Sequence, residues 1–197
     1  MTRRDSIITL GMLCASLPLS LWADEKDGAF IIESGDKESR FKIGKDAFLL
    51  RANSKIALVH DGIFTQSLSL LGGGAMGVFG GGTKTIQTKT FTAGIRGTGI
   101  YLEEYANDAV YSCLCYGNAA YKHPTSQELL LNLECLYHDK PIQIVKTKMG
   151  KLEYQDSKEP NHTDDELRDL EKMCGRSVPF EAFLQEQLLK GKMNHSY

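Results

Sequence analysis

The sequence lacks any run rich in lysine and arginine, and its 23 basic residues are outnumbered by 25 acidic ones. Proteins that bind nucleic acid gather positive charge on one face, because phosphate contacts supply much of their affinity. With a formal net charge of −2 at pH 7, this chain shows no such pattern. We therefore expect it to have no nucleic-acid partner.

Common catalytic motifs are missing as well. The sequence contains no Gly-x-Ser-x-Gly, His-Glu-x-x-His or Cys-x-x-Cys motif, which would indicate a serine hydrolase, a zinc protease or a thiol oxidoreductase. The glycine-rich residues 72–82 resemble a phosphate-binding loop, but Thr83 stands where that loop needs lysine, and a strand-forming sequence follows instead of a helix. We expect these glycines to shape bends in a sheet, and we expect the protein not to be an enzyme.

The first 23 residues have the pattern of an export signal. Arg3 and Arg4 precede an uncharged stretch that ends at Ala23, directly before a charged run. This pattern predicts a signal peptide over residues 1–23, cleaved after Ala23. The paired arginines are consistent with a twin-arginine signal and equally with an ordinary secretory signal. We expect a periplasmic protein; the alternative is an uncleaved segment that anchors the chain in the membrane, although a span needs about 20 apolar residues.

Residues 28–160 are expected to form a mainly β domain. Short runs of isoleucine, leucine, valine and phenylalanine alternate with glycine, aspartate and asparagine, as in strands joined by turns. Asn107 and Asp108 separate two strand-like runs and predict a hairpin. No helical period of useful length occurs before residue 160.

The C-terminal residues 161–192 show two helical patterns and predict a short helical extension packed on the β domain. Thr163 and Glu166 have the spacing of a capping box. The first helix is then expected to present Leu167, Leu170 and Cys174, and to stop at Gly175. The second is expected from Ser177 and Pro179 to Gly191, with an apolar stripe of Phe180, Phe183, Leu184 and Leu188.

The run SLSLLGGGAMGVFGGGTKTIQT (67–88), followed by FTAGIRGTGIYLE (91–103), resembles the FecR-type domain of bacterial envelope proteins. The resemblance covers about residues 40–122, and the IRGTG turn is its most specific part. In the best-known members, this domain is the periplasmic part of an anti-sigma regulator of iron-siderophore uptake. The resemblance implies an antiparallel sandwich or solenoid-like fold and a role in envelope sensing or protein interaction.

The chain departs from those sensor-regulators at its N-terminus. They carry a cytoplasmic anti-sigma segment and a membrane helix ahead of the domain, whereas the residues that precede it here look like a signal. We therefore expect a stand-alone exported member that does not bind a sigma factor directly and that interacts with an unidentified envelope protein or component. A membrane-anchored signalling regulator is an alternative.

Arg96 of the IRGTG motif has two interpretations. It binds an anionic ligand, or it donates hydrogen bonds to the backbone carbonyls of neighbouring turns, which its five donors favour. Gly97 and Gly99 are expected where a Cβ atom would not fit.

Four cysteines lie beyond the predicted signal, and an even number in an exported protein is compatible with two disulfides. A bond between Cys113 and Cys115 is disfavoured, because Cα atoms two apart in a strand are separated by roughly 6.5 Å, the upper edge for a disulfide. A bond from either to Cys135 remains open, since residues 129–139 predict a strand. Cys174 is expected to be a buried free thiol.

A metal site is the principal alternative to a disulfide. Cys113 and Cys115 point to one face of what we expect to be the last strand of the FecR-like domain. Zinc favours four thiolate and imidazole ligands, so we predict a site for zinc, or another soft divalent metal, formed by Cys113, Cys115, His138 and His162. Cys135 could replace either histidine, and a plain core role for the cysteines is a third alternative.

These patterns support one principal functional hypothesis and one alternative. The first is a non-catalytic periplasmic protein, stabilised by a Cys/His metal site, that acts in envelope sensing or protein interaction. The second is an envelope thiol-redox or metal-handling protein in which the Cys-x-Cys pair is the active element.

Overall fold

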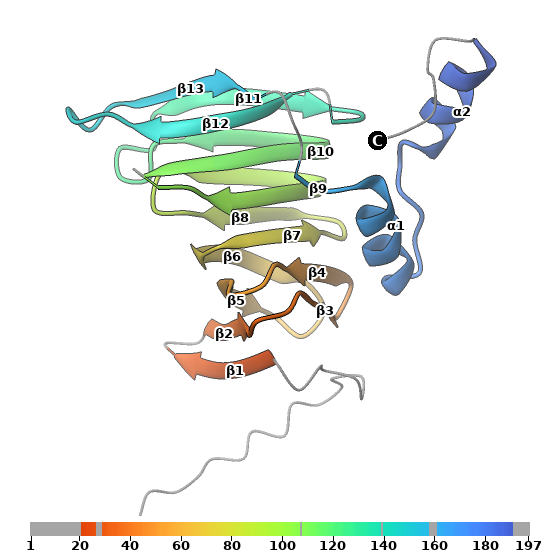
Figure 1. Ribbon diagram of the computed structural model, residues 1–197, viewed down its shortest axis with the longest axis horizontal. Coiled ribbons are helices and arrows are strands. Elements are labelled where there is room, and N and C mark those ends of the chain that lie inside the picture. The colour runs from red at the N-terminus through yellow and green to blue at the C-terminus, as the bar shows by residue number, and fades with distance from the viewer. Residues whose placement is uncertain (1–20, 27–28, 107, 139, 158–160, 191–197) are drawn as a thin grey trace, which may run out of the picture.

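The computed structural model describes residues 21–26, 29–106, 108–138, 140–157 and 161–190 (Figure 1). The predicted signal peptide lies almost wholly outside these residues, so its cleavage and the route of export stay predictions. The first described strand begins at Leu21, and cleavage after Ala23 would therefore divide it. No helix among the described residues has the length and apolar character required to cross a membrane.

Within the described residues, thirteen strands precede two helices, which confirms a mainly β fold with two helices near the C-terminus. The strands are β1 (Leu21–Lys26), β2 (Ala29–Ser34), β3 (Ser39–Ile43), β4 (Asp46–Leu50), β5 (Lys55–His60), β6 (Thr65–Gly72), β7 (Gly74–Val78), β8 (Thr83–Gln87), β9 (Thr92–Glu104), β10 (Ala109–Lys122), β11 (Leu129–Cys135), β12 (Pro141–Lys146) and β13 (Leu152–Asp156). The helices are α1 (Asp164–Met173) and α2 (Glu181–Leu189). The glycine-rich run 72–82 leads into the strand β8, as expected, and not into a phosphate-binding helix.

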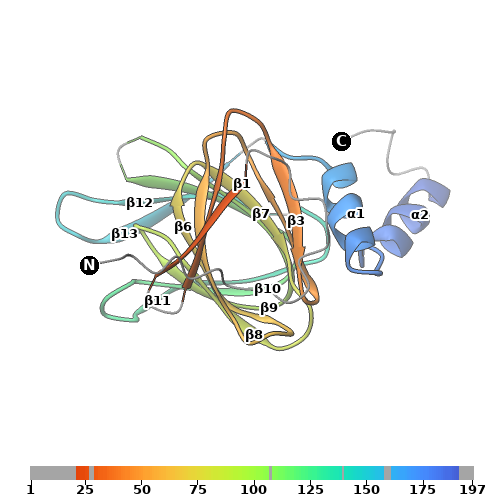
Figure 2. The same cartoon turned by 90° about the horizontal axis from the view of Figure 1, so that it is seen from below.

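The strands form one open sheet in the order β1-β2-β5-β6-β8-β9-β10-β12-β13. From this path, β7, β4 and β3 branch off β9, and β11 branches off β10. All described pairings are antiparallel except that of β6 with β8, which is parallel. Seen from below, the sheet curls round an interior (Figure 2).

Two long strands, β9 and β10, each pair with one neighbour along their first half and with another along their second half, and so join the two sides of the curled sheet. In β9, residues 92–96 pair with β8, whereas residues 99–103 pair with β7. In β10, residues 109–113 pair with β12, whereas residues 117–122 pair with β11. The register between β9 and β10 shifts where they change partners, as expected for bulges that bend a strand.

The prediction that β10 is the last strand of the domain is wrong. β10 pairs with β9 along one edge and with β11 and β12 along the other, so it lies in the interior of the sheet. The expected hairpin before it is present, with Asp108 at a φ of 57°, while Asn107 lies outside the described residues. Three further strands follow β10, because the residues between 129 and 156 also alternate between apolar and polar.

The IRGTG motif lies within β9, where this strand changes partners from β8 to β7, and it does not form a separate turn. Gly97 has a φ of 57°, which favours glycine, although a Cβ atom there would meet no neighbour. At Gly99, a Cβ atom would lie 2.4 Å from Cε1 of Tyr116, which confirms the expectation for that glycine. Arg96 is exposed, and its guanidinium makes no hydrogen bond or ion pair with the described part of the chain, so the expected bonds to backbone carbonyls are not formed.

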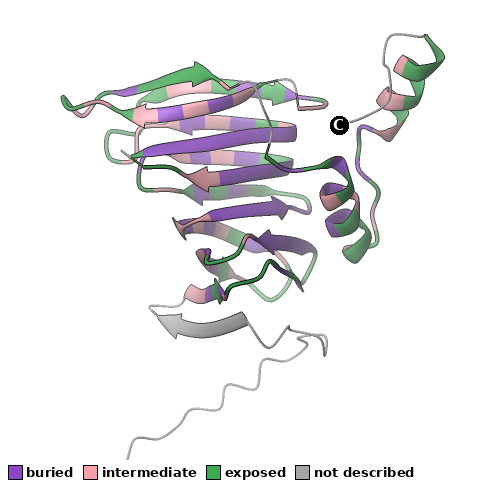
Figure 3. Ribbon diagram, in the orientation of Figure 1, coloured by how far each residue is buried: buried purple, intermediate pink, exposed green. Residues whose placement is uncertain are grey.

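The described residues form two hydrophobic cores, one inside the curled sheet and one between the sheet and the C-terminal segment. Figure 3 shows the buried positions in purple along the strands and on α1. The inner core fills the interior of the curled sheet and includes Phe48, Ile56, Leu58, Ile86, Phe91, Ile100, Leu114, Tyr121 and Ile144. The outer core lies between the sheet and the C-terminal segment and consists of Ala47, Leu49, Met76, Val78, Tyr101, Tyr111, Cys113, Cys115, Tyr116, Leu167, Leu170, Val178 and Phe180. β4 and β7 are buried at every position because they separate the two cores.

The two helices differ in how they meet the sheet. α1 begins at the expected capping box, buries Leu167 and Leu170, and contacts β4 and β7. α2 begins at Glu181, two residues later than Pro179 would place it, and has no buried residue. Of its expected stripe, only Phe180, which precedes the helix, is buried. Figure 1 shows α2 standing beyond α1, away from the sheet.

Candidate metal centre

Two thiols project from the outer face of β10. Cys113 and Cys115 are two positions apart in the strand and therefore point the same way, into the outer core. Leu114, between them, points into the inner core. Both cysteines are 0% exposed and carry free thiols.

His138 reaches the thiols from the loop that follows β11. Its φ is 43°, a left-handed conformation that few residues other than glycine adopt. The backbone N–H of His138 donates to the carbonyl oxygen of Cys115 at 3.0 Å, which fixes this loop against β10. Such strained backbone is typical of functional sites, where the surrounding structure over-determines it.

His162 approaches the same place from the start of α1. The next residue, Thr163, caps the helix: its side chain accepts from the backbone N–H of Glu166, and the Glu166 side chain accepts from the backbone N–H of Thr163. The His162 ring stacks on Tyr101 with a centroid distance of 4.8 Å and an interplanar angle of 18°. The capping box and the stacked ring thus orient this imidazole.

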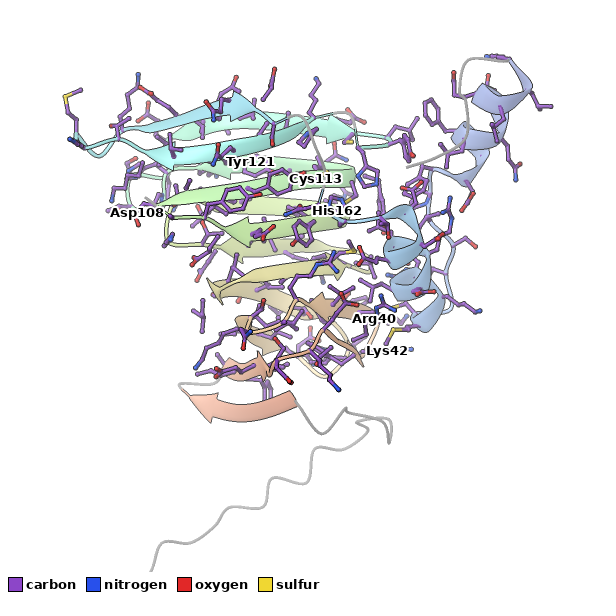
Figure 4. The ribbon with its side chains drawn as sticks, viewed as in Figure 1. Arg40, Lys42, Asp108, Cys113, Tyr121 and His162 are labelled. Carbon is purple, nitrogen blue, oxygen red and sulfur yellow. The ribbon has the colours of Figure 1, made fainter. Side chains whose placement is uncertain are left out.

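The structure brings together all four residues that the sequence predicts as ligands. Sγ of Cys113 lies 3.4 Å from Nδ1 of His138, and Sγ of Cys115 lies 3.2 Å from Nε2 of His162. The same two nitrogens are 3.2 Å apart, and all four donor atoms lie within 4.8 Å of one another. Figure 4 shows Cys113 and His162 beside each other on this face of the sheet.

These distances fit tetrahedral coordination. Bonds of about 2.3 Å to sulfur and about 2.0 Å to nitrogen give a tetrahedron with edges of roughly 3.3–3.8 Å, close to the three shortest separations above. Two thiolates would also neutralise a divalent cation, and a neutral centre costs least to bury. The donor set therefore fits Zn²⁺ in ligand type and charge, and these three separations match the tetrahedron, within a cluster whose donors lie up to 4.8 Å apart. Metal binding itself stays a prediction.

Asp164 supports the site from the first turn of α1. Its Oδ1 lies 3.2 Å from Nε2 of His138, so the other ring nitrogen, Nδ1, faces the thiols. Its Oδ2 accepts from the Tyr137 hydroxyl at 3.0 Å and lies 3.7 Å from the Arg168 guanidinium. Carboxylates that hold the second nitrogen of a ligand histidine are common around protein metals.

The protonation of the metal-free cluster follows from these contacts. Burial lowers the pKa of His138, but Asp164 and Cys113 outweigh it and raise that pKa to about 9. The hydrogen bond from Cys115 lowers the pKa of Cys113 well below its usual value, and burial raises that of Cys115. Cys113 is therefore already poised as a thiolate, the form that binds metal.

The remaining cysteines lie elsewhere. Cys135 belongs to the inner core, on the opposite side of the sheet from the two ligand thiols, so the prediction that it could replace a histidine is wrong. Cys113 and Cys115 are free thiols, and the disulfide alternative with Cys135 is not formed. Cys174 is free, but it is half-buried at the C-cap of α1 and not fully buried.

The sequence-based prediction missed the residues that surround the four donors. Asp164 is recognisable in the sequence only as an acidic residue after a helix cap, and Tyr101 only as a strand residue. The one available signal was the position of His162 directly before a capping box, which implied that first-turn side chains would lie near it.

The solved structures similar to this chain include two crystal structures, at 2.50 and 1.65 Å resolution, each of a proposed anti-sigma factor from Parabacteroides distasonis ATCC 8503. The TM-scores are 0.52 and 0.51 at sequence identities of 10% and 12%, over 66% and 64% of this chain. The chain spans about three fifths of theirs, 60% and 59%. No protein-family model matches the sequence, and no curated protein matches it. At this identity, the likeness establishes similarity of fold alone.

Proposed function

We propose that this chain is a non-catalytic β-rich regulatory protein of the bacterial envelope, stabilised by a structural metal ion held by Cys113, Cys115, His138 and His162. The observation that carries the proposal is the convergence of these four donors, three of them on buried residues and one on the half-buried His138. Structural zinc sites use four protein ligands, whereas catalytic sites keep a position open for water or substrate. A complete set of four ligands leaves the metal no such position.

The fold and the sequence pattern support the regulatory part of the proposal. The similarity to proposed anti-sigma factors agrees with the FecR-type resemblance of residues 40–122, whose best-known members are envelope signalling proteins. The signal-like N-terminus supports a periplasmic location. We infer an envelope protein or component as the partner, with no direct contact to a sigma factor.

Metal analysis of the purified chain tests the proposal. We expect about one zinc per chain, and none in a Cys113→Ser, Cys115→Ser double variant. Cys174→Ser is the matched control, because this thiol lies outside the cluster, and it should retain the metal. Wild-type protein that contains no stoichiometric metal, and takes up neither Zn²⁺ nor Co²⁺ under reducing conditions, would refute it.

A second candidate function rests on one specific observation. Cys113, His138 and Asp164 lie in the order thiol, imidazole, carboxylate, with separations of 3.4 and 3.2 Å, as in the nucleophilic centre of cysteine hydrolases. Full burial of Cys113 argues against it, because a substrate carbonyl could not reach the sulfur. Rapid alkylation of Cys113 by iodoacetamide in folded, metal-free protein, without unfolding, would favour this thiol-based alternative.

A further inference from the structure

We propose that the metal acts as a latch that fastens the C-terminal helical segment to the outer face of the sheet. This inference rests on the proposed metal site and concerns its regulatory use. Metal occupancy would then control whether α1 covers the outer core, while the curled sheet persists in either state.

The ligands come from three separate parts of the chain. Cys113 and Cys115 belong to the sheet itself, His138 to the loop after β11, and His162 to the segment that enters α1. A single ion bound to all four would therefore cross-link the sheet to the start of the helix. Asp164 adds a second tie, since it belongs to α1 and contacts the ligand His138.

α1 depends on such ties because it cannot persist alone. It has ten residues, fewer than the roughly 12–15 that an isolated helix needs even for marginal stability in water. α1 is also attached to the sheet by the buried Leu167 and Leu170 and by a two-pronged ion pair between Glu166 and Arg51, at 2.5 and 2.9 Å. Glu171 accepts a hydrogen bond from the Tyr116 hydroxyl, and Asp169 pairs with Arg40 at 3.2 Å. α2 buries no residue and therefore contributes little to the attachment of the C-terminal segment to the sheet.

The sheet does not share this dependence. None of the four ligands belongs to the inner core, which is the larger of the two and contains no residue of α1 or α2. Loss of the metal should therefore loosen the outer core first. Release of α1 would uncover an apolar strip on β4, β7 and β10 that includes Leu49, Met76, Val78 and Tyr116, and exposed strips of this kind serve as protein interaction sites.

Amide hydrogen exchange of the full chain tests the latch, with Zn²⁺ as the probe. Zinc-loaded protein is compared with the same protein after chelation under reducing conditions, and again after zinc is restored. We expect amides of Leu167–Met173 in α1 to exchange at least tenfold faster without zinc and to recover with it. Amides of β5 and β6, remote from the site, should exchange at an unchanged rate.

Variants separate the latch from a general effect of chelation. Cys115→Ser should show fast exchange in α1 with or without zinc, whereas Cys174→Ser should behave as the wild type. Stoichiometric zinc binding with unchanged exchange in α1 would overturn the latch and leave the metal site intact. Equally faster exchange in α1, β5 and β6 would also overturn it, because the metal would then stabilise the whole fold. A wild-type protein that binds no zinc would instead refute the proposed function.

Discussion

Nδ1 of His138 and Nε2 of His162 lie 3.2 Å apart, although the residues are separated by 24 positions in the chain. One imidazole presents its δ nitrogen and the other its ε nitrogen, because each ring is held by a different neighbour. Asp164 contacts Nε2 of His138, and Tyr101 stacks on the ring of His162. The two rings therefore direct these nitrogens toward the same point beside the two thiols.

The contact between Asp164 and His138 predicts the effect of Asp164→Asn. An amide holds the imidazole less firmly than a carboxylate, so we expect zinc affinity to fall about 10–100-fold, as measured by competition with a chromophoric chelator. Asp165→Asn is the matched control: it removes the same charge from the same helical turn, but Asp165 is exposed and pairs with Arg168. Equal affinities for the two variants would contradict the role of Asp164.

The ion pair between Glu166 and Arg51 predicts a pH-dependent contribution to stability. Burial raises the pKa of Glu166, but the hydrogen bond from Arg51 outweighs it and holds that pKa below its ordinary value of 4.5. A carboxyl group whose pKa is lowered by folding stabilises the fold when the pH is above its pKa in the unfolded chain. This contribution is lost as the pH falls through its pKa in the folded protein. Glu166→Gln should therefore cost about 1.5–3 kcal/mol at neutral pH.

The same variant should match the wild type at low pH. Glutamine keeps the shape of the side chain and can still accept from the backbone N–H of Thr163, so the capping contact is preserved. Urea unfolding at a series of pH values should show the gap between the two proteins closing below about pH 4.5. A gap that stays constant down to pH 3 would show that the carboxylate charge is irrelevant.

The close approach of Gly99 to Tyr116 predicts that Gly99→Ala is destabilising. The new Cβ atom would lie 2.4 Å from the Tyr116 ring, and this ring is buried and hydrogen-bonded to Glu171. Such overpacking typically costs about 1–3 kcal/mol. Gly94→Ala, in the same strand but with no neighbour within 4 Å, should be neutral or slightly stabilising in thermal or urea unfolding. An equal loss in both variants would mean that strand propensity, and not the ring, sets the cost.

The outer core predicts a contrast between two leucines of the C-terminal segment. Leu167 on α1 is fully buried, whereas Leu189 on α2 is 90% exposed. Leu167→Ala should lower the free energy of unfolding of the zinc-loaded protein by about 2–5 kcal/mol. Leu189→Ala should change it by less than about 0.5 kcal/mol. A small effect at Leu167 would indicate that α1 contributes little to the stability of the fold.

Much of the fold is predictable because it depends on local patterns. Alternation of apolar and polar residues identifies the strands, and Thr163 with Glu166 identifies the start of α1, since capping involves groups within one turn. The interior place of β10 is not predictable in this way, because pairing between strands is decided by partners far away in the chain. The exposure of α2 escaped prediction for a related reason: its apolar residues are visible in sequence, but whether a surface meets them is not.

The candidate site was also predictable from the sequence only in part, and for the same reason. The sequence by itself determined that two thiols share one face of a strand, because the two-residue period of a strand is a local property, and it supplied two histidines as further donors. Only the tertiary structure decided that His138 and His162 meet those thiols, that Cys135 lies across the sheet from them, and that Asp164 orients one imidazole. These outcomes depend on how β10, the loop after β11 and α1 pack together, and no local period encodes distances between segments that are remote in the chain.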